Sequence, residues 1–416
     1  MGAPDYDIAI VGGGLVGASL ASLLAAGDEP WRIALIDAVG TSAVSADYRP
    51  HFDHRCTAVS SGSTEILQRL GLWTRLRQHA TAIRRVHVSD RGNLGGACID
   101  ADELRLDSLG YVLENAWLAP SLLEWAQKAP GVTSLMPMSV RQLEPGQGHV
   151  RLTLVSEQGE HKSLSAALVV VADGAESPLR HALGIDTRTV DYHQSAIIAN
   201  VSFTQSHQGV AYERFTGEGP LALLPLDESP HSRRAALVWT LPPARAEQLR
   251  TAEPAEFLST LQERFGWRLG RFQRVGERHI WPLRLLMAKE QIRSNLVLMG
   301  NAAHTLHPVA GQGFNLALRD CARLAEVLVR ARRQGRSPGQ LEVLEDYLGR
   351  QQRDQALTIN LSNQLVHLFT STRAPHTAAR HLGLLGLDLF PPIKAQFAAQ
   401  TMGTAGSRAR WQEGSV

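Results

Sequence analysis

The sequence predicts an α/β fold in which an antiparallel sheet domain is inserted into a βαβ framework and a helical region follows. Residues 6–36 have the pattern of a buried strand, a glycine-rich loop, a helix and a second strand. Alternating segments between residues 190 and 280 are typical of antiparallel strands. The βα pattern returns after residue 294, and helical patterns run from residue 340 to the end.

Each element follows from apolar periodicity and from residues that start or stop helices. Ser61 or Ser63 is the expected cap of a helix over residues 60–69, and Pro120 is expected to open a helix over 119–128. A helix is expected within residues 12–26 and another over 314–332. The expected strands are residues 6–11, 32–36, 84–89, 138–143, 149–155, 167–172, 195–203, 210–215, 220–226, 235–241 and 295–299.

The chain has 416 residues, which is enough for about two or three domains of ~150 residues. The expected division has a discontinuous nucleotide-binding domain of residues 1–80, 110–184 and 278–335. The inserted sheet domain takes residues 81–109 and 185–277, and the C-terminal helical region takes 336–416.

Composition excludes several classes of protein. Apolar residues make up 44% and charged residues 20% of the chain, which is typical of a globular protein. The net charge is only +2, so nothing indicates a nucleic-acid partner, and a neutral small-molecule substrate is favoured. No stretch approaches the ~18 consecutive apolar residues of a membrane span.

The three cysteines, Cys56, Cys98 and Cys321, are far apart and have no metal-type spacing. They are expected to be reduced thiols in a reducing compartment. The first residues have neither the basic nor the apolar region of a signal peptide. These observations predict a cytoplasmic protein.

The first motif is a G-x-G-x-x-G turn, Gly12-Gly13-Gly14-Leu15-Val16-Gly17, between a strand and a helix. Gly12 permits the tight turn, Gly14 lets backbone approach a pyrophosphate, and Gly17 lets the helix pack closely on the strand. Asp37 lies twenty residues after Gly17, at the end of the next strand, where an acid accepts ribose hydroxyls. The combination predicts a dinucleotide site without distinguishing FAD from NAD.

Two further motifs follow predicted strands. Asp173-Gly174 ends the strand at 167–172, and Ser177 with Pro178 provides the cap and first residue of a helix. Alone, this is an ordinary strand–turn–helix corner.

The third motif begins at Gly300-Asn301 and continues through His304, His307-Pro308 and Gly311-Gln312-Gly313-Phe314-Asn315 to Asp320. A helix that begins near Gly313 points its positive end outward, which suits the N1–C2=O edge of a flavin. His304 and His307 have no third ligand at a useful spacing, so no metal is expected.

In this order and separation, the three motifs resemble those of the class A flavoprotein aromatic hydroxylases, the p-hydroxybenzoate-hydroxylase-like FAD-binding fold. The segment from His307 to Asn315, with Asp320, resembles the signature of the ubiquinone-biosynthesis hydroxylases. Within that branch the chain is most similar to the 2-polyprenyl-6-methoxyphenol hydroxylases. That similarity rests on 211–216 (Ala-Tyr-Glu-Arg-Phe-Thr), 219–225 (Gly-Pro-Leu-Ala-Leu-Leu-Pro), Thr305-Leu306 and Leu389-Phe390. Val171 and Ala317 depart from the wider family, which often has glycine there.

The resemblance implies noncovalently bound FAD, NAD(P)H as co-substrate, and hydroxylation of a polyprenylated methoxyphenol by O2 through a flavin C4a-hydroperoxide. Arg55 resembles the flavin-contacting arginine of the family, and Asp173 and Gly174 would serve FAD and the transient NAD(P)H. Pro308 and His307 are the candidate catalytic residues, although His307 is equally interpretable as structural. The implied cofactor-binding residues are Gly12, Gly14, Leu15, Val16, Gly17, Asp37, Arg55, Asp173, Gly174, Asn301, Pro308, Gly311, Gln312, Gly313, Phe314 and Asn315.

Alternatives remain at this point: a hydroxylase of another ring position, a prenyl reductase, or a non-catalytic FAD-binding subunit of a pathway assembly. The segment 219–225 is interpretable either as a wall of the substrate pocket or as core.

The C-terminal segment 382–399 is too short and too interrupted to span a bilayer. It is interpretable as a packed helix, as a docking surface for ubiquinone-biosynthesis proteins, or as a lip that contacts membrane lipid. Because a polyprenyl tail is poorly soluble in water, our hypothesis is that the part beyond Pro392 delivers the substrate, at the periphery of the inner membrane. Self-association into a homo-oligomer is left open.

Overall fold

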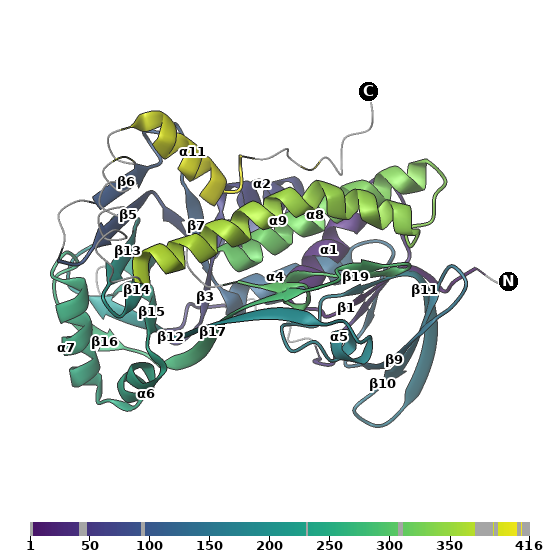
Figure 1. Ribbon diagram of the computed structural model, residues 1–416, viewed down its shortest axis with the longest axis horizontal. Helices are drawn as coiled ribbons and strands as arrows, with labels where there is room; N and C mark the ends of the chain where they lie inside the picture. The colour runs from purple at the N-terminus through teal and green to yellow at the C-terminus, as the bar shows by residue number, and fades with distance from the viewer. Residues whose placement is uncertain are drawn as a thin grey trace.

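The computed structural model describes residues 3–40, 48–92, 96–229, 232–306, 311–370, 386, 390–405 and 409. The predicted mixed α/β fold is confirmed (Figure 1). One end of the molecule contains a mainly parallel sheet, the other an antiparallel sheet, and two long helices, α8 (Gln312–Arg333) and α9 (Leu341–Thr370), run side by side along it. None of the helices in the described ranges has the length and apolar character needed to cross a bilayer.

The first sheet has the order β18-β19-β11-β1-β2-β8, and all of its neighbours are parallel except β18 and β19. The antiparallel strands β9 and β10 extend it from β11. The strands are β1 (Tyr6–Val11), β2 (Ile33–Ile36), β8 (Val132–Leu135), β9 (Ser139–Pro145), β10 (Val150–Val155), β11 (His161–Val171), β18 (Ile292–Arg293) and β19 (Leu296–Leu298). Their apolar side chains are buried on both faces, as expected when parallel strands are covered by helices.

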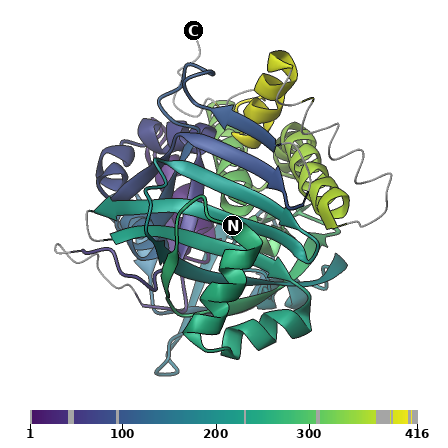
Figure 2. The ribbon, with the colours of Figure 1, turned by 90° about the vertical axis from the view of Figure 1, so that its left-hand side faces the viewer.

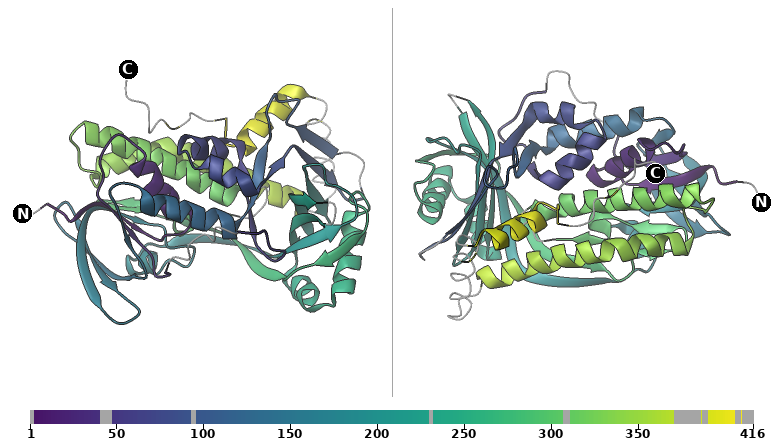
Figure 3. Two further views of the ribbon diagram at one scale, coloured as in Figure 1. Left: turned by 180° about the vertical axis from the view of Figure 1, so that it is seen from behind. Right: turned by 90° about the horizontal axis from the view of Figure 1, so that it is seen from above.

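Helices α1 (Leu15–Ala25), α4 (Asn115–Lys128) and α8 cover one face of this sheet and form one core with it (Figure 3). Helix α5 (Pro178–Ala182) lies at the other face. The chain also forms α2 (Ser61–Arg69), α3 (Trp73–Leu76), the short helix η1 (Arg77–His79) and a three-stranded sheet of β3 (Cys56–Ser60), β7 (Gly110–Glu114) and β4 (Ala80–Ile83).

The second large sheet has the order β20-β17-β12-β15-β14-β13-β5-β6, with β16 paired to β12. Its pairs are antiparallel except β13 with β5. The strands are β5 (Arg85–Asp90), β6 (Gly96–Asp100), β12 (Thr187–Phe203), β13 (Val210–Thr216), β14 (Gly219–Ser229), β15 (Ser232–Leu241), β16 (Phe272–Val275), β17 (His279–Ala288) and β20 (His304–Thr305).

The two faces of this second sheet differ. Helices α6 (Pro243–Thr251) and α7 (Pro254–Phe265) pack on its outer face, which carries Trp239 and Phe203, and Figure 2 looks at the sheet from that end. We call the opposite side the inner face. It packs partly on α11 (Pro391–Thr401) and its C-cap, through Ala398 and Met402, and partly on the three-stranded sheet, through Ile83 and Val112.

Two predicted details of the elements are wrong. Helix α2 is capped by Ser60, whose hydroxyl accepts from the Ser63 amide, and not by Ser61 or Ser63. Helix α4 begins at Asn115, so Pro120 lies inside the helix rather than opening it. The exact domain boundaries stay a prediction, although β17 pairs with β12 of the second sheet up to Ala288.

Candidate flavin site

The first motif forms the turn from β1 into α1. Gly12 has φ +109° and a side-chain carbon there would overlap with the Ala172 carbonyl; one at Gly17 would overlap with the Gly12 carbonyl. A side-chain carbon at Gly14, the N-cap, would have no atom within 4 Å. Gly12 and Gly17 are therefore required by the turn itself, whereas Gly14 faces open space in front of the first-turn amides of α1.

Asp37 lies beside this turn, at the end of β2. Its carboxylate accepts hydrogen bonds from the Gly13 amide at 2.5 Å and the Val39 amide at 2.7 Å. The structure thus brings Asp37 to the glycine turn, as expected for a ribose-binding acid, although its contact with ribose stays a prediction.

The Asp-Gly motif follows β11, which is the parallel neighbour of β1. As predicted, Ser177 caps α5 by accepting from the Arg180 amide at 3.0 Å, and Pro178 is its first residue. Gly174 has φ +103° and open space on its side-chain face. Asp173 is half-buried, but both of its carboxylate oxygens are buried, and neither makes a hydrogen bond of good geometry to the described residues.

Burial raises the pKa of the Asp173 carboxyl above its ordinary value, while the nearby Ser177 and Leu179 act in the opposite direction. A buried carboxylate without a firm partner is costly. Its presence beside the first motif is what a site completed by a polar ligand requires.

The start of the third motif packs against the first. Gly300 has φ +60°, and a side-chain carbon there would lie 2.8 Å from Cγ2 of Val16. Asn301 is exposed at this corner. Its predicted contact with the ribityl chain is compatible with this exposure and stays a prediction.

Arg180 joins the second motif to the third, and sequence reasoning did not assign it a role. Its guanidinium is buried and donates to the Ala302 carbonyl at 3.0 Å and to the Ala175 carbonyl at 2.8 Å. The signal available in the sequence was an arginine placed directly after the Ser177-Pro178 helix start.

The helix after the third motif begins as predicted, with Gly311 at its N-cap in the left-handed conformation, φ +60°. Asn315 is buried and fully used by the protein: its amide nitrogen donates to the Ala58 and Gly311 carbonyls, and its oxygen accepts from the Ser60 amide. Asn315 therefore holds the start of α8 against β3, and its predicted flavin contact stays a prediction.

Among the other residues of this motif, Gln312 is buried and donates to the Thr401 carbonyl at 2.9 Å, whereas a side-chain carbon at Gly313 would meet open space. Phe314 is half-buried against the core of the first sheet. The candidate catalytic residues His307 and Pro308 lie outside the described residues.

His304 belongs to a buried polar network. Its Nε2 lies 2.8 Å from the Asp320 carboxylate, which also accepts from the amides of Gln351 and Gln355 on α9. The histidine ring is thus engaged in a contact between β20, α8 and α9. In the described part of the chain no group of three or more metal-ligating side chains was found.

Arg55 is exposed, and its guanidinium lies 5.5 Å from the ring centre of Trp281, which is 48% exposed. The backbone of Arg55 is fixed because its carbonyl accepts from the Asn115 amide at 2.7 Å.

The preceding segment, residues 48–54, is tied to the three-stranded sheet and to the second large sheet. The buried Glu114 carboxylate accepts from the Tyr48 hydroxyl at 2.6 Å, contacts His54 Nδ1 at 2.6 Å and pairs with Arg234 of β15 at 3.2 Å. Asn200 of β12 donates to the Phe52 and His54 carbonyls at 2.7 and 2.8 Å.

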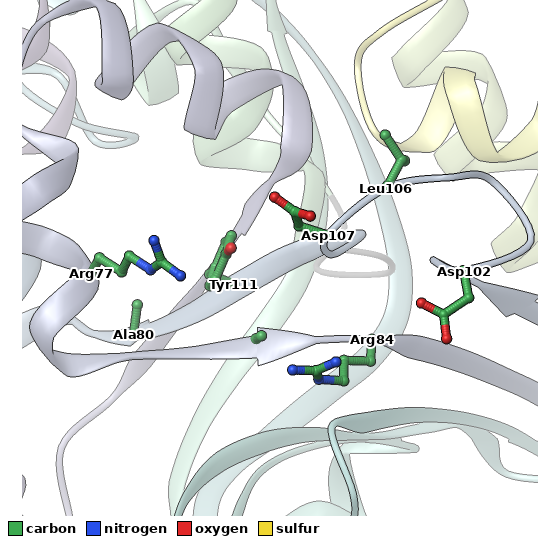
Figure 4. Close-up of a pocket in the computed structure, with 8 residues that line it drawn as sticks. Arg77, Ala80, Arg84, Asp102, Leu106, Asp107 and Tyr111 are labelled. Atoms are coloured by element: carbon green, nitrogen blue, oxygen red, sulfur yellow. The ribbon is translucent and has the colours of Figure 1, made fainter.

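A separate surface pocket of about 520 Å³ lies near β4 and the 101–109 segment (Figure 4). Arg77 and Arg84 line it together with Asp102, Asp107 and Tyr111. None of the predicted flavin residues lies in this pocket.

These residues fit FAD. Open space in front of Gly14, Gly174 and Gly313, a carboxylate at the end of β2 and an orphaned carboxylate at Asp173 occur on elements that pack together. Residues 5–352 match the family described as FAD binding domain. The chain belongs to this family. FAD is its cofactor, and the class to which it belongs is that of FAD-dependent hydroxylases.

Similar proteins extend over nearly the whole chain. Ubiquinone hydroxylase UbiL of Rhodospirillum rubrum is 36% identical over 401 residues, covering 96% of this chain and 90% of that protein. The 3-demethoxyubiquinol 3-hydroxylase of Escherichia coli K12 is 32% identical, covering 95% and 98%. Among solved structures, p-nitrophenol 4-monooxygenase from Pseudomonas putida DLL-E4 has a TM-score of 0.77 at 20% identity, covering 96% and 98% of the two chains. That last likeness confirms the fold of the FAD-dependent aromatic monooxygenases.

Proposed function

We propose that this protein hydroxylates the ring of a polyprenylated methoxyphenol in ubiquinone biosynthesis, with NAD(P)H as reductant and O2 as oxygen source. The observation that carries the proposal is the 36% identity to a ubiquinone hydroxylase over 96% of the chain. The similarity to a 3-demethoxyubiquinol 3-hydroxylase, 32% over 95% of the chain, supports the same substrate class.

FAD, when bound, supplies the electron transfer and the activation of oxygen. The amides of α1 beyond Gly14 would hold its pyrophosphate, and Asp37 its adenosine ribose. The positive N-terminal end of α8 would stabilise negative charge on the reduced ring system. Asn301 would bind the ribityl hydroxyls as an uncharged partner.

The inner face of the second sheet supports an apolar aromatic substrate. Ala222, Leu224 and Val238 face this side, and each keeps part of its surface accessible. Apolar side chains here exclude water from the reacting ring. The 219–225 strand therefore contributes to both interpretations made from the sequence, since Leu221 and Leu223 are core and Ala222 and Leu224 face inward.

One experiment separates this function from a prenyl reductase and from a non-catalytic FAD-binding subunit. The holoenzyme is incubated with a prenylated methoxyphenol, NADH or NADPH and isotopically labelled O2, and the products are analysed by mass spectrometry. We expect one labelled oxygen in the ring. A product reduced in its prenyl chain would instead identify a prenyl reductase. FAD binding without any substrate-dependent NAD(P)H oxidation would identify a non-catalytic subunit.

A further inference from the structure

The inner face of the second sheet carries the carboxyl of Glu213. Glu213 on β13 is directly opposite Ala222 of β14 and Val88 of β5. Because paired residues project to the same side, its neighbours can be followed across the sheet. Alternate residues of β13, Ala211 and Phe215, project with it and are buried.

The row of the sheet that contains Glu213 is otherwise apolar from β6 to β12, and its next member, on β17, is His279. Following the register from β6 to β12 gives Ala97, Val88, Glu213, Ala222, Val238 and Ile198. The small side chains of Ala222 and Ala211 leave the carboxyl between short neighbours, on the face turned away from α6 and α7.

Within the described part of the chain, no residue forms a hydrogen bond or ion pair with the Glu213 carboxyl. The titratable groups that project from this face include Asp90 on β5, Arg234 on β15 and His279 on β17. Arg234 is held by Glu114 and Asp227, and His279 lies 3.5 Å from the Glu277 carboxylate. Burial alone raises the pKa of Glu213, to about 7.

The end of α9 lies against β13 and β14 (Figure 1). After Asp354 the sequence of this helix contains no Asp, Glu, Lys or Arg, and its one titratable residue there is His367. The environment that α9 brings to the inner face is thus predominantly uncharged.

Glu213 lies deep in the molecule and yet keeps part of its surface accessible. An unpaired carboxyl in apolar surroundings costs folding free energy, and such groups concentrate where a protein binds or transforms a ligand.

We propose that Glu213 is a catalytic base that accepts the proton of the substrate's phenolic hydroxyl. This inference rests on the proposed function. The phenolic O–H bond breaks, its electron pair stays on the phenol oxygen, and the proton moves to a carboxylate oxygen of Glu213. The phenolate ring is more electron-rich and therefore more reactive toward an electrophilic oxygen. When the ring has been hydroxylated, the proton returns from Glu213 to the phenolate oxygen of the product.

The test compares three variants of the holoenzyme with the wild type. Glu213→Gln keeps the shape and removes the base, Glu213→Asp keeps a carboxylate, and Glu263→Gln changes an exposed carboxylate on α7, beyond the opposite face of the sheet. FAD content, kcat, KM and the yield of hydroxylated product per NAD(P)H oxidised are measured with a short-chain methoxyphenol across pH.

We expect Glu213→Gln to keep FAD and to lower kcat for hydroxylation by about 100-fold or more. In the wild type, kcat should rise with pH through about 7 as Glu213 ionises, and the Gln variant should lack this rise. Glu213→Asp should recover part of kcat and the pH dependence, and Glu263→Gln should behave as the wild type.

A Glu213→Gln enzyme with wild-type kcat and pH profile would overturn the proposal and leave the proposed function standing. Loss of FAD from both Glu213 variants would show that Glu213 has a structural role in the sheet, and this result would also overturn the proposal. A wild-type holoenzyme that hydroxylates no phenol would remove the proposed function and, with it, this inference.

Discussion

The glycines of the first motif have two different physical roles at the scale of single residues. Gly12 and Gly17 are required by backbone atoms of the protein, whereas nothing in the protein opposes a side chain at Gly14. The spacing of the motif in the sequence does not reveal this difference. It becomes visible only when the turn is placed against Ala172 and the start of α1.

Gly14→Val should therefore fold and lose FAD, because the branched side chain fills the space of the pyrophosphate without disturbing the apoprotein. Gly17→Val is the contrasting variant and should fail to fold, since its side chain overlaps with the Gly12 carbonyl. Flavin absorbance and circular dichroism of both proteins are the measurements. Normal flavin content in folded Gly14→Val would exclude this loop as the pyrophosphate site.

Glu213 also predicts a pH-dependent stability. Its ordinary pKa of 4.5 rises to about 7 on folding. Below about pH 4.5 the group is protonated in both states and contributes nothing. Between about pH 4.5 and pH 7, the carboxyl ionises in the unfolded chain but stays protonated in the folded protein. The folded state therefore loses stability as pH rises, by at most about 3 kcal/mol at higher pH.

Glu213→Gln cannot ionise, so it should be more stable than the wild type at about pH 8 and equal to it at about pH 4. Urea unfolding at the two pH values checks this, with Glu263→Gln as the control. Equal stability of Glu213→Gln and the wild type at the higher pH would mean that Glu213 is ionised without cost in the folded protein.

At the scale of elements, the contact between α8 and α9 contains a buried polar centre. Asp320 accepts from Gln351 and Gln355 and pairs with His304, and both His304 and Asp320 are almost fully buried. The sequence showed Asp320 as part of a family signature. Its physical partners, 31 and 35 residues further on, could not be identified before α9 was placed.

Asp320→Ala should destabilise the protein by about 3–5 kcal/mol, because it leaves three buried polar side chains without their acceptor. Asp346→Ala, which removes a partly exposed ion pair with Arg350 on α9, should cost no more than about 0.5 kcal/mol. Denaturant unfolding measures both. Similar small costs for the two variants would show that the buried network contributes little.

The C-terminal helix α11 is attached to the cofactor half of the chain. The Gly62 amide donates to the Met402 carbonyl at 3.1 Å, and Gln312 at the start of α8 donates to Thr401. Ala398 and Met402 are buried. The packed-helix interpretation made from the sequence thus describes the structure, while a role in substrate delivery is untested.

Truncation after Phe390 should lower the thermal midpoint and weaken FAD retention, because it exposes the inner-face core and removes the Thr401 carbonyl to which Gln312 donates. Thermal unfolding and flavin content are the measurements. Intact FAD with selective loss of turnover for long-chain substrates would instead support the delivery hypothesis.

At the scale of the whole molecule, the sequence was sufficient for the fold class and the order of most elements. The glycine turns and the period-two strands are local signals that burial reinforces. What it could not provide were contacts between distant segments: Arg180 with Ala302, Asn315 with Ala58 and Ser60, and Glu114 with Arg234. These contacts depend on how elements distant in the sequence pack together, which no local pattern encodes.

Asn200 tests the connection between residues 52–54 and the second large sheet. Its amide holds the carbonyls of Phe52 and His54 against β12. Asn200→Ala should loosen the segment that leads to Arg55, and weaken FAD and phenol binding together by roughly 1–2 kcal/mol in total. Fluorescence titrations of FAD into apoprotein, with and without a phenol, measure both affinities. Unchanged affinities would show that residues 51–54 are positioned from the Glu114 side alone.

The same segment has a thermodynamic consequence. Residues 51–55 are bound at once to the second large sheet, which faces the substrate in the proposed function, and to the junction of β7 and α4. A phenol that shifts or rigidifies the sheet therefore changes the freedom of Arg55. By thermodynamic linkage, if the phenol changes the affinity for FAD by some factor, FAD changes the affinity for the phenol by the same factor. The affinities for FAD and for the phenol are then thermodynamically coupled. A substitution selected for tighter phenol binding would also change the affinity for FAD.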